Sequence, residues 1–414
     1  MPVRPPLPPG PYLVAGLARS GKAAARMLAA RGEEVIGVDS GEPTGLEDLG
    51  VEVHTATDGV VLLERAATLV KSPGVPREAP VVAGALARGI EVIGELELAW
   101  RALPNRFVAV TGTNGKTTTV ELTGVMFRAA DMPVAVAGNV GTPLVSLVGE
   151  LDPEAWVVCE CSSFQLEDSS AFAPEVAVLL NLEEDHLDRH VTLERYREAK
   201  LRAFANQPPG AVAIAPEGLE LPGDADRRGF ADLGGMEIRL RGAHNAENAA
   251  AAAAAALAAG VPHDAVAEAL RSFTGVEHRL EEVADVDGVL YVNDSKATNV
   301  ASAVKGVEAF EGGVHVILGG SLKGGGFTGL RDAVKARCRA AYLIGEAADR
   351  LTEDLDGTVR LHPCGTLERA VGHAAGAARP GEVVLLSPAC ASFDHFRDYE
   401  QRGERFRELV PGGE

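Results

Sequence analysis

Short runs of apolar, mostly β-branched residues recur along the chain, and each is followed by a polar turn and a stretch with helical periodicity. Short apolar runs between turn residues are typical of buried strands. The predicted strands lie at 12–16, 34–39, 51–54 and 68–71, at 134–137, 156–160, 176–180 and 211–215, and at 289–293, 314–318, 341–344 and 383–386. Strands that alternate with helices predict an α/β protein with parallel sheets.

The predicted helices fill the gaps between these strands. They lie at 20–30, with Ser20 as the N-cap, at 96–102, 193–206, 263–273 and 393–409, and in the Ala-rich stretch that ends at Gly260. A chain of 414 residues is too long for one hydrophobic core. The pattern changes at Gly94, and residues 274–279 have the composition of a hinge. We therefore predict three α/β domains, at 1–94, 95–275 and 276–414.

Composition excludes several classes of partner. The net charge of −20 argues against nucleic acid and anionic membranes, since both attract basic patches. No run of 18 apolar residues predicts a membrane span, and the Pro-rich start lacks the apolar segment of a signal peptide. The five cysteines contain no C-x-x-C pair; Cys159 and Cys161 would share one face of a strand. Buried, reduced cysteines and a cytoplasmic location are the prediction.

The first strand ends in a glycine turn that opens a helix, with Gly16 and Gly21 at its two ends. Asp39 ends the next strand, where a dinucleotide-binding unit has its ribose-binding acid. Ala18 stands where the middle glycine of that fingerprint would be. The turn is thus weak evidence for NAD and better evidence for some nucleotide diphosphate at the helix start.

A second glycine turn follows the apolar run at 108–110, in the sequence T-G-T-N-G-K-T-T at 111–118. Gly112 and Gly115 allow a sharply bent loop, Lys116 adds a positive charge, and Thr117 adds a hydroxyl suited to Mg²⁺. The match to a P-loop is imperfect, because Val110 stands at the place of its first glycine. A generic glycine-rich turn is the alternative, but the strand-loop-helix context favours a triphosphate site.

Acids and histidines follow two central strands. Glu160 ends the run at 156–160 and could supply an oxygen ligand to Mg²⁺, although an acid there could instead pair with a base. The stretch at 181–190 is dense in acids and histidines, and His186 is its candidate ligand or positioning residue. Some of these side chains are expected to be merely solvated.

The T-G-T-N-G-K-T-T loop, with D-H-L-D at 185–188, resembles the muramyl ligase family, which also includes folylpolyglutamate synthase. The segments at 160–165, 293–299 and 386–394 resemble the branch of that family that adds D-glutamate. The resemblance spans nearly the whole chain. It implies a Rossmann-like UDP-binding domain, a central P-loop-type ATPase domain and a C-terminal Rossmann-like domain around one cleft.

The resemblance also implies a reaction. ATP would phosphorylate the L-alanine carboxylate of UDP-N-acetylmuramoyl-L-alanine, and the amine of D-glutamate would attack the acyl phosphate to give an amide, ADP and phosphate. The implied cofactors are ATP, two Mg²⁺ ions and a carbamylated lysine, formed from CO₂, at Lys200. The expected partners are these small molecules only, with no nucleic acid and no membrane, and the protein is expected to be a monomer.

Residue by residue, the resemblance implies four sets of contacts. The ATP set is Gly112, Thr113, Asn114, Gly115, Lys116, Thr117, Thr118, Asn245, Asn248, Arg279 and Asp294. The metal set is Thr117, Glu160, His186 and Lys200, and the catalytic set is Lys116, Lys200, His186 and Glu160. The UDP-muramoyl set is Ala18, Arg19, Ser20, Asp39, Ser40, Ser72, Asn139, Ser162 and Gln165. The D-glutamate set is Thr298, Lys323, Ser392, Phe393 and Tyr399.

Several alternatives stay open from the residues alone. Lys200 could be a surface residue of an amphipathic helix, and Asn245 could cap the Ala-rich helix. Other muramyl ligases or folate-polyglutamylating enzymes are rival functions, but they do not explain the S-P-A-C-A-S segment at 387–392. A nucleotide-binding regulator would not need the metal set. An NAD-dependent dehydrogenase would not need a phosphate loop.

Overall fold

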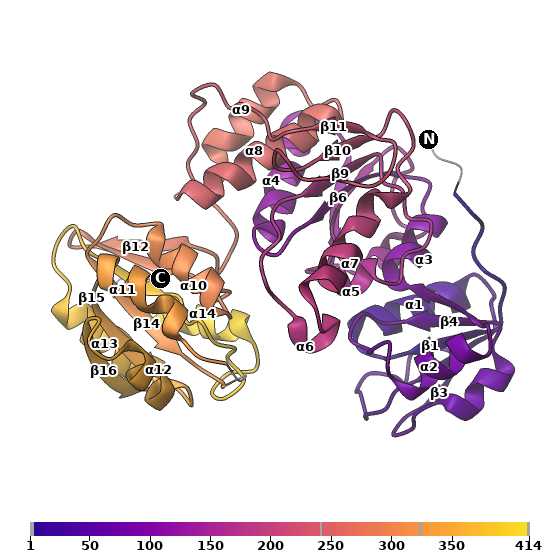
Figure 1. Cartoon of the computed structure of the whole chain (residues 1–414), viewed down its shortest axis with the longest axis horizontal. Helices are drawn as coiled ribbons and strands as arrows, with labels where there is room; N and C mark the ends of the chain where they lie inside the picture. Colours follow the sequence, from indigo (N-terminus) through magenta and orange to yellow (C-terminus); the bar gives the residue numbers. More distant parts are fainter. Residues whose placement is uncertain (1–3, 241, 323–324, 412–414) are drawn as a thin grey trace. The chain divides into compact units, whose positions relative to one another are not determined.

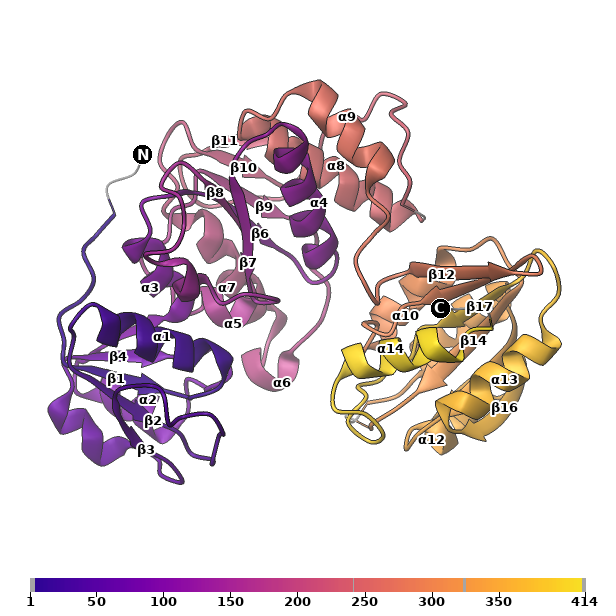
Figure 2. The ribbon, with the colours of Figure 1, turned by 180° about the vertical axis from the view of Figure 1, so that it is seen from behind.

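The computed structural model describes residues 4–240, 242–322 and 325–411, without the side chains of Leu187 and Asp188. The chain forms two compact units, one of residues 1–237 and 248–271 and the other of residues 238–247 and 272–414. The first unit contains two sheets and the second contains one, and helices lie on the faces of each (Figures 1 and 2). The described part of the chain is thus the predicted α/β fold. None of the described helices combines the length and apolar character needed to cross a membrane.

The first sheet has the order β3-β2-β1-β4-β5, with all pairs parallel. Its strands are β1 (Tyr12–Ala15), β2 (Val35–Val38), β3 (Glu52–His54), β4 (Thr68–Lys71) and β5 (Glu91–Gly94), and the helices around it are α1 (Arg19–Ala30), α2 (Pro80–Ala87) and the 3₁₀ helix η1 (Val60–Arg65). Successive residues of β1 enter different cores: Tyr12 and Val14 belong to one cluster, and Leu13 and Ala15 to another. This alternation explains why the strand is apolar throughout.

The second sheet has the order β11-β10-β9-β6-β8-β7 and is also parallel. Its strands are β6 (Arg106–Thr111), β7 (Val134–Gly138), β8 (Trp156–Glu160), β9 (Val176–Leu179), β10 (Val212–Ile214) and β11 (Asp226–Arg228). Its helices are α3 (Glu95–Ala102), α4 (Lys116–Ala129), η2 (Leu144–Leu147), α5 (Ser163–Leu166), α6 (Leu187–His190), α7 (Leu193–Ala205), α8 (Ala243–Ala258) and α9 (His263–Ser272). Figure 2 shows α4 beside β6 and β7.

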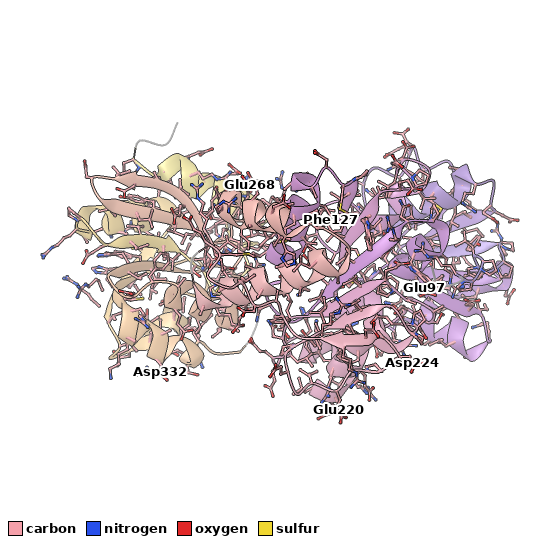
Figure 3. All side chains as sticks on the ribbon, turned by 90° about the horizontal axis from the view of Figure 1, so that it is seen from above. Glu97, Phe127, Glu220, Asp224, Glu268 and Asp332 are labelled. Carbon is pink, nitrogen blue, oxygen red and sulfur yellow. The ribbon has the colours of Figure 1, made fainter. Side chains whose placement is uncertain are left out.

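A buried carboxylate ties α3, the first helix after the first sheet, to the second sheet's core. Glu97, labelled in Figure 3, accepts hydrogen bonds from the backbone N–H groups of Ala171 (3.0 Å) and Phe172 (2.9 Å), and it pairs with Arg101. The Trp100 and Phe172 rings then pack edge to face at 5.8 Å. One core therefore continues from the first sheet into the second.

The third sheet has the order β12-β13-β17-β14-β15-β16, parallel except for the antiparallel edge pair β12–β13. Its strands are β12 (Glu281–Val286), β13 (Val289–Asn293), β14 (Val314–Gly319), β15 (Cys338–Ile344), β16 (Arg360–Gly365) and β17 (Val383–Leu386). Its helices are α10 (Val300–Glu308), η3 (Thr328–Leu330), α11 (Arg331–Arg337), α12 (Ala348–Leu355), α13 (Leu367–Ala377) and α14 (Tyr399–Leu409).

Three local predictions are corrected. The helix expected at 20–30 begins one residue earlier with Ala18 as N-cap, so Ser20 is not the cap. The helix expected at 393–409 begins only at Tyr399, because the Asp398 side chain caps it there by accepting from Gln401 N–H. Finally, Cys338 is only half-buried, whereas the other four cysteines are buried as predicted, and none of these five described residues forms a disulfide.

Candidate active site

The predicted phosphate loop joins β6 to α4, at the carboxyl edge of the second sheet. Gly115 is the N-cap of α4 with a left-handed φ of 84°, and no side chain caps the helix. Gly112 has φ 153°, and a Cβ there would lie 2.9 Å from Leu180 Cβ. The helix start therefore presents N–H groups and the positive end of its dipole, as an anion site requires.

Two lysines converge on the same loop carbonyl. Lys116 Nζ donates to Gly112 O (2.9 Å) and Thr113 O (2.8 Å), and Lys200 Nζ donates to Gly112 O (2.7 Å). Lys200 is only 1% exposed, so the surface interpretation of this residue is wrong. Burial, and then the neighbouring Lys116 charge, lower the pKa of Lys200 well below its ordinary value.

Glu160, at the end of β8, lies against the phosphate loop. One carboxylate oxygen accepts from Thr117 Oγ1 (2.7 Å), and the other accepts from Asn139 Nδ2 (2.9 Å). The structure thus brings together the two residues predicted for the first Mg²⁺ ion. A hydroxyl and a carboxylate are hard oxygen donors that fit this ion. Among the described residues, no group of three or more His, Cys, Asp and Glu side chains forms a ready cation cage.

His186 lies at the beginning of α6 and has a left-handed φ of 52°. Its half-exposed ring lies 4.8 Å from the Phe164 ring, and Nε2 is 3.5 Å from an Asp185 oxygen. The neighbouring His190 is the buried one, with Nε2 2.9 Å from Ser163 Oγ, and burial lowers its pKa.

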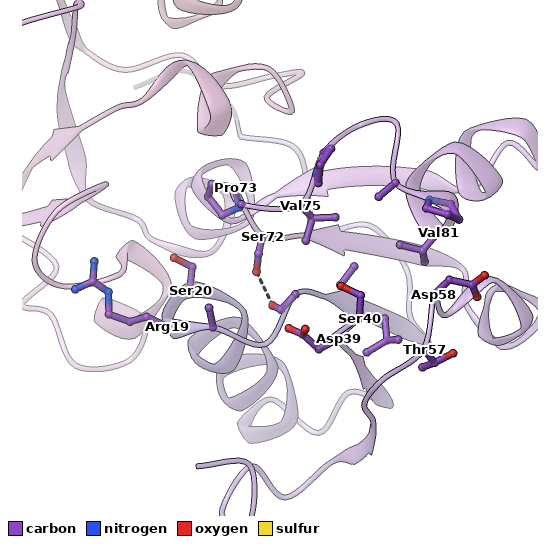
Figure 4. A pocket seen from close by; sticks show the side chains of 18 of the residues that line it. Arg19, Ser20, Asp39, Ser40, Thr57, Asp58, Ser72, Pro73, Val75 and Val81 are labelled. Carbon is purple, nitrogen blue, oxygen red and sulfur yellow. Dashed lines mark hydrogen bonds between the residues drawn. The ribbon is translucent and has the colours of Figure 1, made fainter. Parts of the chain in front are cut away.

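A cavity of about 510 Å³ opens at the carboxyl edge of the first sheet (Figure 4). Eight of the nine residues predicted for the UDP-muramoyl substrate line it, namely Ala18, Arg19, Ser20, Asp39, Ser40, Ser72, Asn139 and Gln165. The ninth, Ser162, is instead the N-cap of α5 in a reciprocal capping box with Gln165, and so holds one cavity residue in place. Asn139 faces both this cavity and Glu160.

The glycine turn beneath this cavity is held by side-chain bonds. Asp39 accepts from the N–H groups of Leu17 (2.6 Å) and Gly41 (2.8 Å), and Ser72 Oγ donates to Gly16 O (2.7 Å, Figure 4). A Cβ at Gly21 would lie 1.7 Å from Gly16 O, so only glycine lets the helix approach this closely.

Asn245 and Asn248, the two asparagines predicted for adenine, are buried residues in the first turns of α8. A Cβ on Gly115 would lie 2.1 Å from Asn248 Oδ1, so Asn248 packs directly against the phosphate loop. Asn245 lies inside α8, which begins at Ala243, so it is not the N-cap.

In the second unit, Asp294 is a buried carboxyl at the end of β13. It accepts from Ser387 Oγ (2.7 Å), and burial raises its pKa to about 7. It also accepts from Leu280 N–H (3.3 Å), next to Arg279. Arg279 and Asp294, both predicted for ATP, are therefore neighbours.

The described residues predicted for D-glutamate lie in connections that follow β13 and β17 of the same unit and at the start of α14. Ser392 is buried, Phe393 is 70% exposed, and Tyr399 begins α14 with Lys296 Nζ 5.4 Å from its ring. Thr298 lies between β13 and α10. Lys323 lies outside the described residues.

Comparison with known proteins decides the family. The chain matches the Mur ligase MurD-like N-terminal domain at 11–94, the Mur ligase middle domain at 110–221, and the Mur ligase glutamate ligase domain at 278–390. The UDP-N-acetylmuramoylalanine–D-glutamate ligase of Acidobacterium capsulatum is 42% identical over 96% of this chain and 95% of its own. The chain belongs to the Mur ligase family. The ligase of the same name from Solibacter usitatus is also 42% identical, over 97% of both chains.

Solved Mur ligases share the fold. UDP-N-acetylmuramate-alanine ligase MurC from Thermotoga maritima has a TM-score of 0.61 at 18% identity and covers 96% of this chain and 98% of its own. MurF ligase from Thermotoga maritima, solved in complex with ADP, has a TM-score of 0.61 at 19% identity, over 97% and 94%. Identities this low support the three-domain Mur ligase fold alone.

The sequence did not reveal which residues hold the phosphate loop of this Mur ligase in shape. Asn181 Oδ1 accepts from the N–H groups of Thr113 (3.1 Å) and Asn114 (2.9 Å). Glu183 accepts from Asn114 Nδ2 (2.9 Å), and Tyr196 OH lies 3.1 Å from Thr113 Oγ1. For Asn181 and Glu183 the only sequence signal is their position after β9, the strand that pairs with β6. Tyr196 lies in α7 and has no such signal.

A buried arginine organises the strand ends of the second unit, and it was also missed. Arg402 of α14 is fully buried and donates to Ser295 O (2.8 Å), Cys390 O (3.1 Å) and Ala391 O (3.2 Å). Burial lowers its pKa to about 10. It joins two of the segments that carry the predicted D-glutamate and ATP contacts.

Proposed function

We propose that this Mur ligase uses ATP to join D-glutamate to UDP-N-acetylmuramoyl-L-alanine, in the synthesis of the peptidoglycan precursor. The observation that supports it most is the side chain of Asn139. It lines the cavity assigned to the UDP substrate and donates to Glu160, which accepts from Thr117 of the phosphate loop. Only the side chains of Asn139 and Glu160 would thus separate a substrate in the cavity from Thr117 of the phosphate loop.

The loop residues suit phosphoryl transfer to a carboxylate. Both reactants are anions, so the site must offset their repulsion. Lys116 and the start of α4 would do this, with Lys116 turning from its loop carbonyls to the phosphates. Mg²⁺, held by Thr117 and Glu160, would add positive charge and order the triphosphate. His186 is proposed for a second Mg²⁺ ion.

Carbamylation of Lys200 is part of the proposal. A neutral amine attacks CO₂ and releases a proton, which gives an anionic carbamate. The environment of Lys200 favours the neutral amine, because the side chain is buried and Lys116 shares its acceptor. Carbamylation would thus replace the positive charge of the Lys200 ammonium by an anionic oxygen ligand near Thr117 and Glu160.

The remaining contacts follow from the family. Gly112–Thr118 of the loop, Asn245, Asn248, Arg279 and Asp294 are proposed for ATP, and Thr298, Lys323, Ser392, Phe393 and Tyr399 for D-glutamate. Domain limits at 1–94, 95–275 and 276–414, a monomeric state, a cytoplasmic location and the absence of nucleic-acid or membrane partners belong to the same proposal.

The test is phosphate release from ATP and Mg²⁺ with UDP-N-acetylmuramoyl-L-alanine and one amino acid at a time. We expect release with D-glutamate and only background with L-glutamate, L-lysine or meso-diaminopimelate. Release that depends on another amino acid would move the protein to a different branch of the family.

A further inference from the structure

Residues 72–76 form a rigid Ser-Pro-Gly-Val-Pro loop that follows β4 and makes one wall of the cavity assigned to the UDP substrate (Figure 4). The prolines fix parts of its backbone, and carbonyl groups of the half-buried residues Pro73 and Val75 need hydrogen-bond donors. The donors come from a different part of the chain.

Arg189, in α6, supplies most of them. Its guanidinium donates to three consecutive loop carbonyls, those of Pro73 (3.3 Å), Gly74 (3.5 Å) and Val75 (2.8 Å). The same group lies 4.8 Å from the Phe164 ring centre. Two nitrogens of one planar guanidinium thus reach three carbonyls of the turn, whereas a lysine would offer a single charged nitrogen.

Lys71 approaches the same loop from the strand side. Its fully buried ammonium donates to Val75 O (2.9 Å) and pairs with Asp168 (2.7 Å) and Glu167 (3.3 Å). Glu167 also pairs with Arg189 (2.9 Å). Two cations and two carboxylates therefore form a charge-balanced network around the Val75 carbonyl, where an unpaired charge would be very costly.

We propose that Arg189, with Lys71 and Glu167, is a positioning device that holds the 72–76 loop against the UDP substrate and couples it to α6. The coupling follows from sequence distance, since Arg189 lies three residues after His186 in the same short segment. A shift of the loop would pull on the segment that carries the proposed metal residue. This inference rests on the proposed function for the identity of the ligand.

Plain structural ion pairing is the competing account. It explains the salt bridge to Glu167 but not the choice of backbone acceptors, because all three carbonyls that Arg189 contacts belong to residues that line the cavity. The neighbouring Arg202 of α7 offers a matched control. Its side chain also makes a part-buried hydrogen bond to a backbone carbonyl, but that carbonyl is Ser169 O (2.9 Å) and not one of the loop.

The experiment compares Arg189→Met, Arg189→Lys and Arg202→Met in the full chain. Met keeps an apolar side chain of comparable length but removes the donors and the cation over the Phe164 ring. For Arg189→Met we expect KM for UDP-N-acetylmuramoyl-L-alanine to rise about tenfold or more, since several charge-assisted hydrogen bonds are lost, while KM for ATP changes less than about twofold. Arg189→Lys should lie between this variant and the wild type, and Arg202→Met should match the wild type.

Hydrogen exchange without any ligand separates this inference from the proposed function. Backbone amides at 72–79 should exchange about tenfold faster in Arg189→Met than in Arg202→Met, whatever the enzyme's substrate is. Faster exchange in a protein that lacks D-glutamate-dependent activity would uphold the clamp and refute the function. Unchanged exchange, or equal increases of KM for all three substrates, would overturn the clamp.

Discussion

The two glycine turns at the heads of α1 and α4 share one backbone plan but differ in charge. Both follow a parallel strand, both begin with a glycine at positive φ, and both open a helix without a side-chain cap. In the first turn a carboxylate, Asp39, accepts from the Leu17 N–H. In the second a neutral amide, Asn181, does the same for Thr113 and Asn114.

The difference indicates that the surrounding charges, more than the backbone, select the ligand. An anion beside the first turn disfavours a densely charged triphosphate and suits the hydroxyl groups of a nucleoside. Two buried or half-buried lysines beside the second turn favour the triphosphate. The following variants test this contrast, from the largest expected effect to the smallest.

Lys116→Ala should have the largest effect. We expect kcat to fall about a thousandfold or more, because charge stabilisation of the transferring phosphoryl group is lost. Binding of UDP, measured by calorimetry, should be unchanged. Lys22→Ala is the matched control, since Lys22 follows the first turn and donates to Thr44 O at the surface. Equal losses of activity in Lys116→Ala and Lys22→Ala would contradict the claim that only the second turn handles the triphosphate.

Lys200→Ala should abolish most activity, because the proposed carbamate ligand cannot form. Short carboxylic acids added to the assay should restore part of it by occupying the space of the lost carbamate. Arg197→Ala, an exposed residue of the same helix, should keep wild-type activity. Full activity of Lys200→Ala would exclude Lys200 from the metal set.

Gly21→Ala should destabilise the first unit by about 1–3 kcal/mol, because the new Cβ overlaps a backbone oxygen that cannot move without the strand. The measurement is denaturant unfolding, with loss of UDP affinity as a second signal. Gly229→Ala, where a Cβ would meet nothing within 4 Å, is the control. Equal stability of the two variants would show that α1 can move away from β1.

The buried Lys200 also predicts a pH dependence of stability. Its folded pKa lies well below the ordinary lysine value, so between these two pKa values the unfolded chain binds the extra proton. Stability should therefore rise with pH in that window, by at most about 1.4 kcal/mol per pH unit. Unfolding in CO₂-free buffer at increasing pH should show this slope, and Lys200→Met should lack it. If the unfolding free energies of the wild type and of Lys200→Met changed with pH in the same way, the lowered pKa of Lys200 would be contradicted.

The sequence predicts best where local pattern and sheet topology coincide. Ala18, Asp39 and Ser72 come from three separate strand ends, and they meet because parallel strands bring their carboxyl ends to one edge. Lys200 shows the opposite case. Its helix has an amphipathic pattern that allows exposure, and the side chain is buried because α7 packs against α5, α6, β6 and β9.

Contacts between distant polar residues were not predictable from one sequence. Arg189 meets the 72–76 loop across more than a hundred positions, and Arg402 meets Ser295 across 107. Neither has a periodicity or a motif that marks it. Side-chain capping also set the true start of α14 at Tyr399, because Asp398 competes with any earlier helix start.

The most direct test of the account follows the oxygen atoms of the substrate. UDP-N-acetylmuramoyl-L-alanine labelled with ¹⁸O in its alanyl carboxylate is incubated with ATP, Mg²⁺ and D-glutamate, and the phosphate and the nucleotide product are analysed by mass spectrometry. If the carboxylate is phosphorylated before the amide forms, one ¹⁸O atom appears in each released phosphate, together with a product that contains glutamate. Unlabelled phosphate, or labelled turnover without D-glutamate in the product, would contradict the account.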